Sequence, residues 1–194
     1  MAVLIRTLAP ALALACLAGV ASAAATTLTP LDQALAHAFP GARIQPVTLA
    51  LSPADVKAVE QRAHARCEAR LVTAYVAWHG DTLAGAAYTD RRVVRTREAL
   101  FMITVAPDTT VARIDVLAFF EPPDYRPSER WLARFEGAHP DVPPLAGASL
   151  TSRAVSESAR LALAWHALLL TPELAKRHRG PEARKAQASA GGEP

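Results

Sequence analysis

Apolar side chains alternate with other residues between positions 71 and 119, and this alternation constrains the fold more than any other feature of the sequence. In the first stretch every second position is apolar or aromatic: Val72, Ala74, Val76 and Trp78. Because successive side chains of a strand point to opposite faces, this spacing predicts a strand over 71–78. The turn His79-Gly80-Asp81 then leads into a returning strand over 82–89.

A second pair of strands is expected over 100–105 and 111–119, joined by the turn Ala106-Pro107-Asp108-Thr109. Strands that follow one another through short turns pair in antiparallel fashion. The sequence therefore predicts an α+β fold, in which helices pack on an antiparallel sheet meander.

Three segments begin with a hydroxyl residue, a proline and a nearby acid, an order that favours a helix start. Thr29-Pro30-Leu31-Asp32 predicts a helix over 30–38, and Ser52-Pro53-Ala54-Asp55 predicts one over 53–68. Thr171-Pro172-Glu173 is expected to turn the chain into a C-terminal tail.

Two further helices are expected in the second half of the chain. Pro127 opens a short helix that places Trp131, Leu132 and Phe135 on one face and ends at Gly137. The longest helical stretch runs from Leu150 to Leu170. The expected organisation is a signal peptide over 1–23, an N-terminal helical segment over 24–69, a sheet domain over 70–171 and a flexible tail over 172–194.

The first 23 residues have the features of a secretory signal peptide. Arg6 precedes a short apolar run, and Ala21-Ser22-Ala23 fits cleavage between small residues. Cys16 leaves a lipoprotein as the alternative. We therefore expect an exported protein, periplasmic or otherwise extracytoplasmic, with membrane association left open.

The charge distribution argues against a nucleic-acid partner. The chain has a formal net charge of +3 and a pI of about 9.2. Residues 24–171 nevertheless hold 15 basic and 15 acidic residues, so the excess charge lies mainly at the two ends. A neutral core without a known nucleic-acid motif predicts no binding to DNA or RNA.

The cysteine and histidine patterns predict neither a disulfide nor a metal site. Cys67 is the only cysteine after residue 23, and we expect it to be buried as a small hydrophobic residue. The six histidines lack the paired spacing of metal ligands. His166 falls on the apolar face of the last helix and is expected to be a packed core histidine.

Small residues and hydroxyls meet at the start of the last helix, in Leu145-Ala146-Gly147-Ala148-Ser149-Leu150-Thr151-Ser152-Arg153-Ala154-Val155. A helix N-terminus offers unpaired N–H groups and a positive potential, which suits a phosphate. Gly147 and Ala148 allow a ligand close to the backbone. The alternative is that Ser149 or Thr151 simply caps the helix.

This stretch resembles the small-Gly-Ala-Thr/Ser-x-Thr signature of the FMN-binding domain family. That family includes the flavin subunits of Rnf-type and sodium-pumping NADH:quinone oxidoreductase complexes, together with short exported proteins. Three upstream stretches are also similar to its short exported members: 94–98, 117–127 and 130–137. The resemblance covers roughly residues 71–167.

The resemblance implies that Thr151 carries FMN through a phosphoester, which a separate magnesium-dependent flavin transferase installs outside the cytoplasm. Tyr125 and Trp131 are expected to offer stacking surface to the isoalloxazine ring, and Arg126 a charge near it. The alternatives are core filling for Trp131, and turn chemistry with a local ion pair for Glu121, Tyr125 and Arg126. The expected cofactor-binding residues are Thr151, Gly147, Ala148, Ser149, Leu150, Ser152, Tyr125, Arg126 and Trp131.

The signature departs from the usual Asp-x-x-Ser-Gly-Ala-Thr-x-Thr of the family at three positions. Pro143 replaces the aspartate, Ala146 the serine and Ser149 the first threonine. Ser149 keeps a hydroxyl, whereas the missing aspartate is a feature that a transferase could read. Covalent FMN on Thr151 is the first expectation, and non-covalent FMN or a flavin-free relative are the alternatives.

Four arginines lie within seven residues: Arg91, Arg92, Arg95 and Arg97. Such a cluster is typical of a solvated edge or loop. The alternative is that the arginines bind lipid headgroups, the flavin phosphate or an acidic partner.

The resemblance implies electron transfer between membrane and periplasmic redox proteins rather than catalysis. No nucleophile, base and orienting group can be assembled from the spacing, so no catalytic residue is assigned. Two alternatives stay open. One is a flavin-free envelope binding or assembly module with the same fold, and the other is a flavin reductase that acts on a small substrate.

Overall fold

The computed structural model describes residues 27–137, 143 and 145–175. The expected signal peptide with Cys16 and most of the expected C-terminal tail lie outside the described residues.

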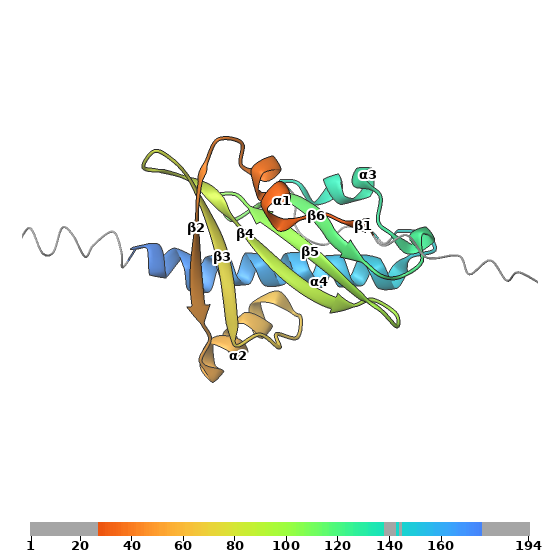
Figure 1. Cartoon of the computed structure of the whole chain (residues 1–194). Helices are drawn as coiled ribbons and strands as arrows, with labels where there is room; N and C mark the ends of the chain where they lie inside the picture. The colour runs from red at the N-terminus through yellow and green to blue at the C-terminus, as the bar shows by residue number, and fades with distance from the viewer. Residues whose placement is uncertain (1–26, 138–142, 144, 176–194) are drawn as a thin grey trace, which may run out of the picture.

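Six antiparallel strands form one sheet in the order β1-β6-β5-β4-β3-β2 (Figure 1). From β2 to β6 each strand pairs with the next one along the chain, which is a meander. The predicted α+β fold is therefore confirmed. The strands are β1 Thr27–Leu28, β2 Arg43–Ala50, β3 Leu71–His79, β4 Thr82–Val93, β5 Glu98–Val105 and β6 Val111–Phe119.

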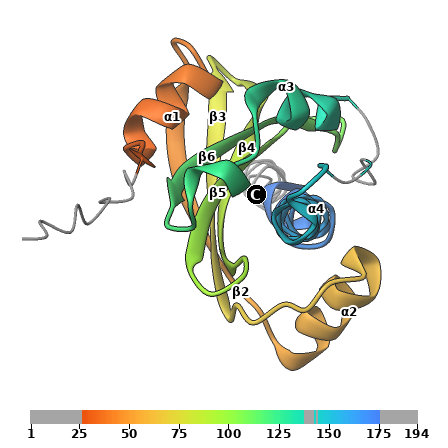
Figure 2. The same cartoon turned by 90° about the vertical axis from the view of Figure 1, so that its right-hand side faces the viewer.

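Helices cover both faces of this sheet (Figure 2). The long helix α4 crosses one face with α2 beside it, and α1 lies on the opposite face. The α-helices are α1 Leu31–Ala38, α2 Pro53–Ala63, α3 Glu129–Leu132 and α4 Ser149–Trp165. Short 3-10 turns cover Pro123–Tyr125 and Ala133–Phe135, and a π turn covers His166–Leu170.

Alternation along the central strands supplies two separate cores. Phe101 and Ile103 belong to the larger core, together with Val155 of α4. Met102, between them in sequence, belongs to the smaller core with Leu35 of α1. Because successive side chains point to opposite faces, β5 is buried on both of its faces.

The strand β2 is an element that the sequence does not predict. Within the described part of the chain it is an edge strand that pairs with β3 alone, with Pro46 opposite Tyr75. An edge strand tolerates a proline because one side of the strand needs no ladder partner. The segment 24–69 therefore contributes an edge strand to the sheet in addition to its helices.

The predicted start of α2 is confirmed. The amide of Asp55 donates to Ser52 Oγ at 3.2 Å, and the amide of Ser52 donates to Asp55 Oδ2 at 2.9 Å, which is a capping box. The helix ends at Ala63 rather than at residue 68, because His64 adopts the left-handed conformation with φ of 47°.

The helix predicted over 30–38 is observed as α1, but two details of the predicted helix starts are wrong. The N-cap of α1 is Pro30 and no side chain caps it among the described residues, so Thr29 does not have the expected role. The Thr171-Pro172 pair lies inside a helical run that continues from α4 through the π turn to residue 175. Pro172 has no N–H and cannot donate the helical hydrogen bond to the carbonyl four residues earlier. The π turn before it is wider than an α-helical turn and accommodates the missing bond.

Gly85 allows β4 to pass close to β5. Its φ is +142°, and a Cβ at this position would lie 2.6 Å from the carbonyl oxygen of Val105 and 3.2 Å from the ring of Phe39. The β3–β4 register shifts at the same place, between Ala77 and Trp78. Only a residue without a side chain fits this bulge.

Candidate functional site

The start of α4 is open on one side. Gly147 has φ of +76°, and a Cβ there would meet no heavy atom of the described residues within 4 Å. Ser149 and Leu150 are exposed on the first turn, whereas the N-cap residue Ala148 is buried. No side chain of the described residues caps the helix. The alternative that Ser149 or Thr151 caps this helix is therefore wrong.

The two hydroxyls that follow are buried and hydrogen-bonded. Ser152 Oγ donates to the carbonyl of Ala148 at 3.0 Å and accepts from the amide of Leu145 at 2.7 Å, which closes the turn before the helix. Thr151 is 1% exposed, and its Oγ1 donates to the carbonyl oxygen of Tyr125 at 2.9 Å. Thr151 therefore faces inward, against the 3-10 turn Pro123–Tyr125.

Tyr125 connects Thr151 to a surface pocket. The guanidinium carbon of Arg95 lies 4.4 Å from the centre of the Tyr125 ring, a cation–π contact. Beside this contact is a cavity of about 400 Å³, which we name the Arg95–Tyr125 pocket. Its lining residues are Arg95, Thr96, Arg97, Phe120, Glu121, Pro122 and Tyr125.

Glu121 holds one wall of the Arg95–Tyr125 pocket in place. This residue is 5% exposed, and its Oε1 accepts three backbone N–H groups, from Thr96 at 2.6 Å, Arg97 at 2.8 Å and Arg95 at 3.0 Å. Burial by itself raises the pKa of Glu121. The three N–H donors and the Arg95 charge together outweigh burial and lower that pKa below its ordinary value. The buried carboxylate is therefore charged. For Glu121 the sequence indicates turn chemistry with a local ion pair.

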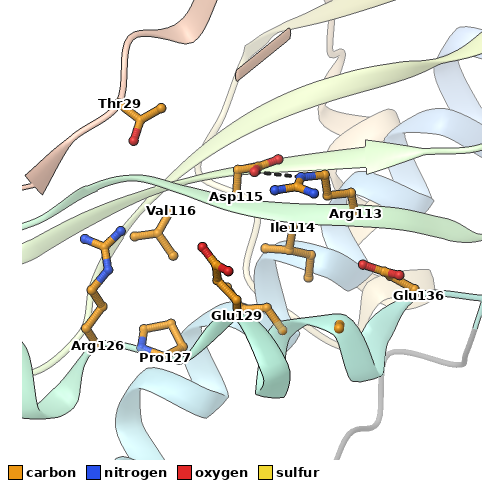
Figure 3. Close-up of a pocket in the computed structure, with 11 residues that line it drawn as sticks. Thr29, Arg113, Ile114, Asp115, Val116, Arg126, Pro127, Glu129 and Glu136 are labelled. Carbon is orange, nitrogen blue, oxygen red and sulfur yellow. Dashed lines mark hydrogen bonds and ion pairs between the residues drawn. The ribbon is translucent and has the colours of Figure 1, made fainter. Parts of the chain in front are cut away.

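Arg126 faces a different pocket from its neighbour Tyr125 (Figure 3). This second cavity measures about 270 Å³ and lies between β6 and the segment that contains α3. Across it β6 presents Asp115, whose Oδ1 accepts from Nε of Arg113 at 2.8 Å. The structure therefore does not bring Arg126 into the pocket that Tyr125 lines.

Trp131 is a packed side chain. It is 4% exposed and meets the Phe135 ring nearly edge-on, with 5.2 Å between the ring centres. Its Nε1 donates to the carbonyl oxygen of Pro143 at 3.1 Å. This environment fits the core-filling alternative better than an open stacking surface. The indole also ties α3 to the segment before α4.

The four clustered arginines have different environments. Arg92 is largely buried and pairs with Asp90 at 2.7 Å and with Glu157 of α4 at 3.5 Å. Arg91 makes an exposed pair with Glu98 at 3.4 Å. Arg95 and Arg97 are exposed on the loop after β4 and line the Arg95–Tyr125 pocket. The interpretation as a solvated edge or loop therefore fits Arg91, Arg95 and Arg97 but not Arg92.

His166 is a packed core histidine, as predicted. It is 2% exposed, and its Nδ1 lies 3.2 Å from the hydroxyl of Tyr88. Burial lowers the pKa of His166 to about 4 and raises the pKa of Tyr88. Cys67 is likewise buried, as predicted, although it lies beyond the end of α2.

Within the described ranges, no three or more His, Cys, Asp or Glu residues gather where they could hold a metal ion. In the same part of the chain no helix combines the length and the apolar character needed to cross a bilayer.

No family model matches the chain, and neither a curated protein nor a solved structure shows significant similarity to it. Functional inference therefore depends on the residues and geometry of this chain.

Proposed function

We propose that this chain is an exported electron-transfer protein that carries FMN on Thr151, attached through a phosphoester by a separate flavin transferase. Membrane or periplasmic redox proteins would be its electron donor and acceptor. FMN supplies reversible uptake and release of electrons, while the protein binds and orients it.

The observation that carries this proposal is the set of contacts that joins four separate stretches of the sequence. Glu121 fixes the backbone of residues 95–97, and Arg95 in turn stacks on Tyr125. The carbonyl oxygen of Tyr125 accepts a hydrogen bond from the hydroxyl of Thr151. The fourth stretch joins through Trp131, whose indole binds the segment before α4. The stretches that resemble the FMN-binding domain family thus belong to one spatial neighbourhood.

The start of α4 suits the phosphate of FMN. Amide groups of the first helical turn have no partner within the helix, and their partial positive charge favours an anion. Because no described side chain caps α4, these donors are not taken by a cap. The positive φ of Gly147 and the open space around it leave room beside the backbone.

The burial of Thr151 sets a condition on attachment. Attachment forms a bond between Oγ1 and the phosphorus of FMN while a phosphoanhydride P–O bond of a flavin dinucleotide donor breaks. The nucleoside monophosphate is the leaving group, and the hydroxyl proton is released. The transferase must therefore act on a chain in which Oγ1 has left the carbonyl of Tyr125, since Thr151 is only 1% exposed. The same observation favours a second candidate function, a flavin-free envelope module in which Thr151 merely fastens α4 to the 3-10 turn.

An intact-mass measurement separates these two functions. The full chain is produced together with a flavin transferase, alongside Thr151→Ala and the control Thr48→Ala, which removes an exposed threonine hydroxyl from the edge strand β2. We expect the wild-type chain and Thr48→Ala to gain the mass of FMN less one water, and Thr151→Ala to gain nothing. A wild-type chain that stays unmodified, while a known family member is flavinylated in the same cells, contradicts the proposal and supports the flavin-free module.

A further inference from the structure

We propose that the Arg95–Tyr125 pocket receives the isoalloxazine ring of FMN, with the guanidinium groups of Arg95 and Arg97 beside it. This inference rests on the proposed function. It assigns the ring to a different set of residues from Trp131 and Arg126, which the sequence suggests.

The position of Thr151 relative to the pocket is the first argument. Thr151 Oγ1 lies 2.9 Å from the carbonyl oxygen of Tyr125, and Tyr125 lines the pocket. A group attached at Thr151 therefore begins next to a residue that lines the pocket.

The two other candidate seats are less suitable. Trp131 is 4% exposed and already packs against Phe135, so a ring that stacks on it would have to displace core side chains. Arg126 lines the cavity of Figure 3, which measures about 270 Å³ and is smaller than the Arg95–Tyr125 pocket.

The shape and lining of the Arg95–Tyr125 pocket suit a flat aromatic ligand. Its volume of about 400 Å³ falls within the usual size range of small-molecule sites. Phe120, directly after β6, is 39% exposed and lines this pocket. Tyr125 and Phe120 offer apolar contact, and ring stacking on such side chains is favourable.

The charge of the pocket suits a ring that becomes negative when it is reduced. Arg95 and Arg97 are both exposed on the loop after β4. Among the described residues that line the pocket, Glu121 is the only acidic one, and its Oε1 already accepts three backbone N–H groups. The guanidinium groups are therefore the charges that a ring in this pocket meets. They would favour the reduced flavin and raise its midpoint potential.

The test compares arginine variants of the flavinylated chain. Arg97→Gln and Arg95→Gln each remove one positive charge but keep the backbone N–H that Glu121 binds. Arg43→Gln makes the same change on the edge strand β2, at the opposite side of the sheet, and serves as the control. For each protein we measure intact mass, the midpoint potential of the attached flavin and the visible circular dichroism of the ring.

We expect all of these variants to gain FMN. Arg97→Gln and Arg95→Gln should lower the midpoint potential and change the dichroism, and Arg43→Gln should match the wild type. If both pocket variants carry FMN with the potential and dichroism of the Arg43→Gln control, the ring lies elsewhere and this inference is wrong while the proposed function stands. If the wild-type chain gains no FMN, the proposed function fails, and this inference fails with it.

Discussion

Glu121 controls the conformation of the loop after β4 through one carboxylate oxygen. Replacement by alanine leaves three backbone N–H groups without their acceptor. We expect Glu121→Ala to lower the free energy of unfolding by about 2–3 kcal/mol and Glu121→Gln, which keeps an oxygen acceptor, by about 1 kcal/mol. Urea denaturation measures both. The control Glu98→Gln, which breaks an exposed pair with Arg91, should cost under about 1 kcal/mol.

The Glu121 carboxylate also predicts a dependence on acid. Its pKa in the folded chain is lower than its ordinary value, so the unfolded chain takes up the proton first. The stability it contributes is present above the unfolded pKa of about 4.3 and is lost as the pH falls through the lower, folded pKa. Urea midpoints between pH 6 and pH 3 should fall less steeply in Glu121→Gln than in the wild type. Equal slopes would show that Glu121 does not carry this dependence.

At the scale of elements, the π turn at the end of α4 places His166 beside Tyr88 of β4, and both side chains are buried. Because the pKa of His166 is about 4 in the fold, only the unfolded chain binds a proton on this side chain between pH 6.5 and pH 4. Stability therefore falls as the pH drops through that window, by about 2 kcal/mol between pH 7 and pH 5.

The double variant Tyr88→Phe/His166→Phe tests this pH effect. It removes both hydrogen-bonding partners together, so neither is left buried and unpaired. We expect its unfolding free energy to change less between pH 7 and pH 5 than that of the wild type. If the two proteins lose the same stability over this range, His166 is not the group responsible.

The two expected helix caps give a matched pair of variants. Ser52→Ala removes a side chain that accepts from the Asp55 amide, and it should cost about 1 kcal/mol. Thr29→Ala removes a hydroxyl that does not cap α1 and should cost clearly less. Thermal or urea unfolding gives both values. A larger loss of unfolding free energy for Thr29→Ala than for Ser52→Ala would contradict the conclusion that Ser52 caps α2 and Thr29 does not cap α1.

The predictability of each element follows from its local physics. β6 is predicted at its observed bounds and β3 to within one residue, because alternation reports burial directly. β2 is missed because Pro46 interrupts the strand pattern of residues 43–50. A proline is tolerated there because β2 lies at the edge of the sheet, which the sequence does not reveal. The end of α2 at His64 and the continuation through Pro172 depend on backbone conformations that no residue pattern in this sequence marks.

The candidate site was predictable in part. The sequence indicates the start of α4 and Tyr125, and these do lie together. It does not indicate that Arg126 faces another pocket, that Trp131 is packed, or that Glu121 holds three amides of a distant loop. Each of these depends on contacts between segments far apart in the chain, which local spacing does not encode.

At the scale of the whole molecule, α2 and α4 share one core with the sheet. Val59 of α2 is fully buried in it, so Val59→Ala should lower the free energy of unfolding by about 2 kcal/mol. The exposed Val93 is the control, and Val93→Ala should change stability by less than about 0.5 kcal/mol.

The spectroscopic signal makes Val59→Ala a test of cooperativity. All three tryptophans, Trp78, Trp131 and Trp165, lie outside α2. If the segment 24–69 unfolds together with the rest, the substitution shifts the tryptophan fluorescence transition and the circular dichroism transition equally. A shift in circular dichroism alone would show that α2 unfolds separately.

The hydrogen bond between Thr151 and Tyr125 has a consequence for maturation. The hydroxyl is the donor of this pair, and a phosphoester at Oγ1 would leave two oxygen acceptors facing each other without a proton between them. The 3-10 turn Pro123–Tyr125 would then have to separate from α4. Attachment of FMN would therefore open the contact between the 3-10 turn and α4. Hydrogen exchange of the Tyr125 amide would be faster in the chain that carries FMN than in the unmodified chain.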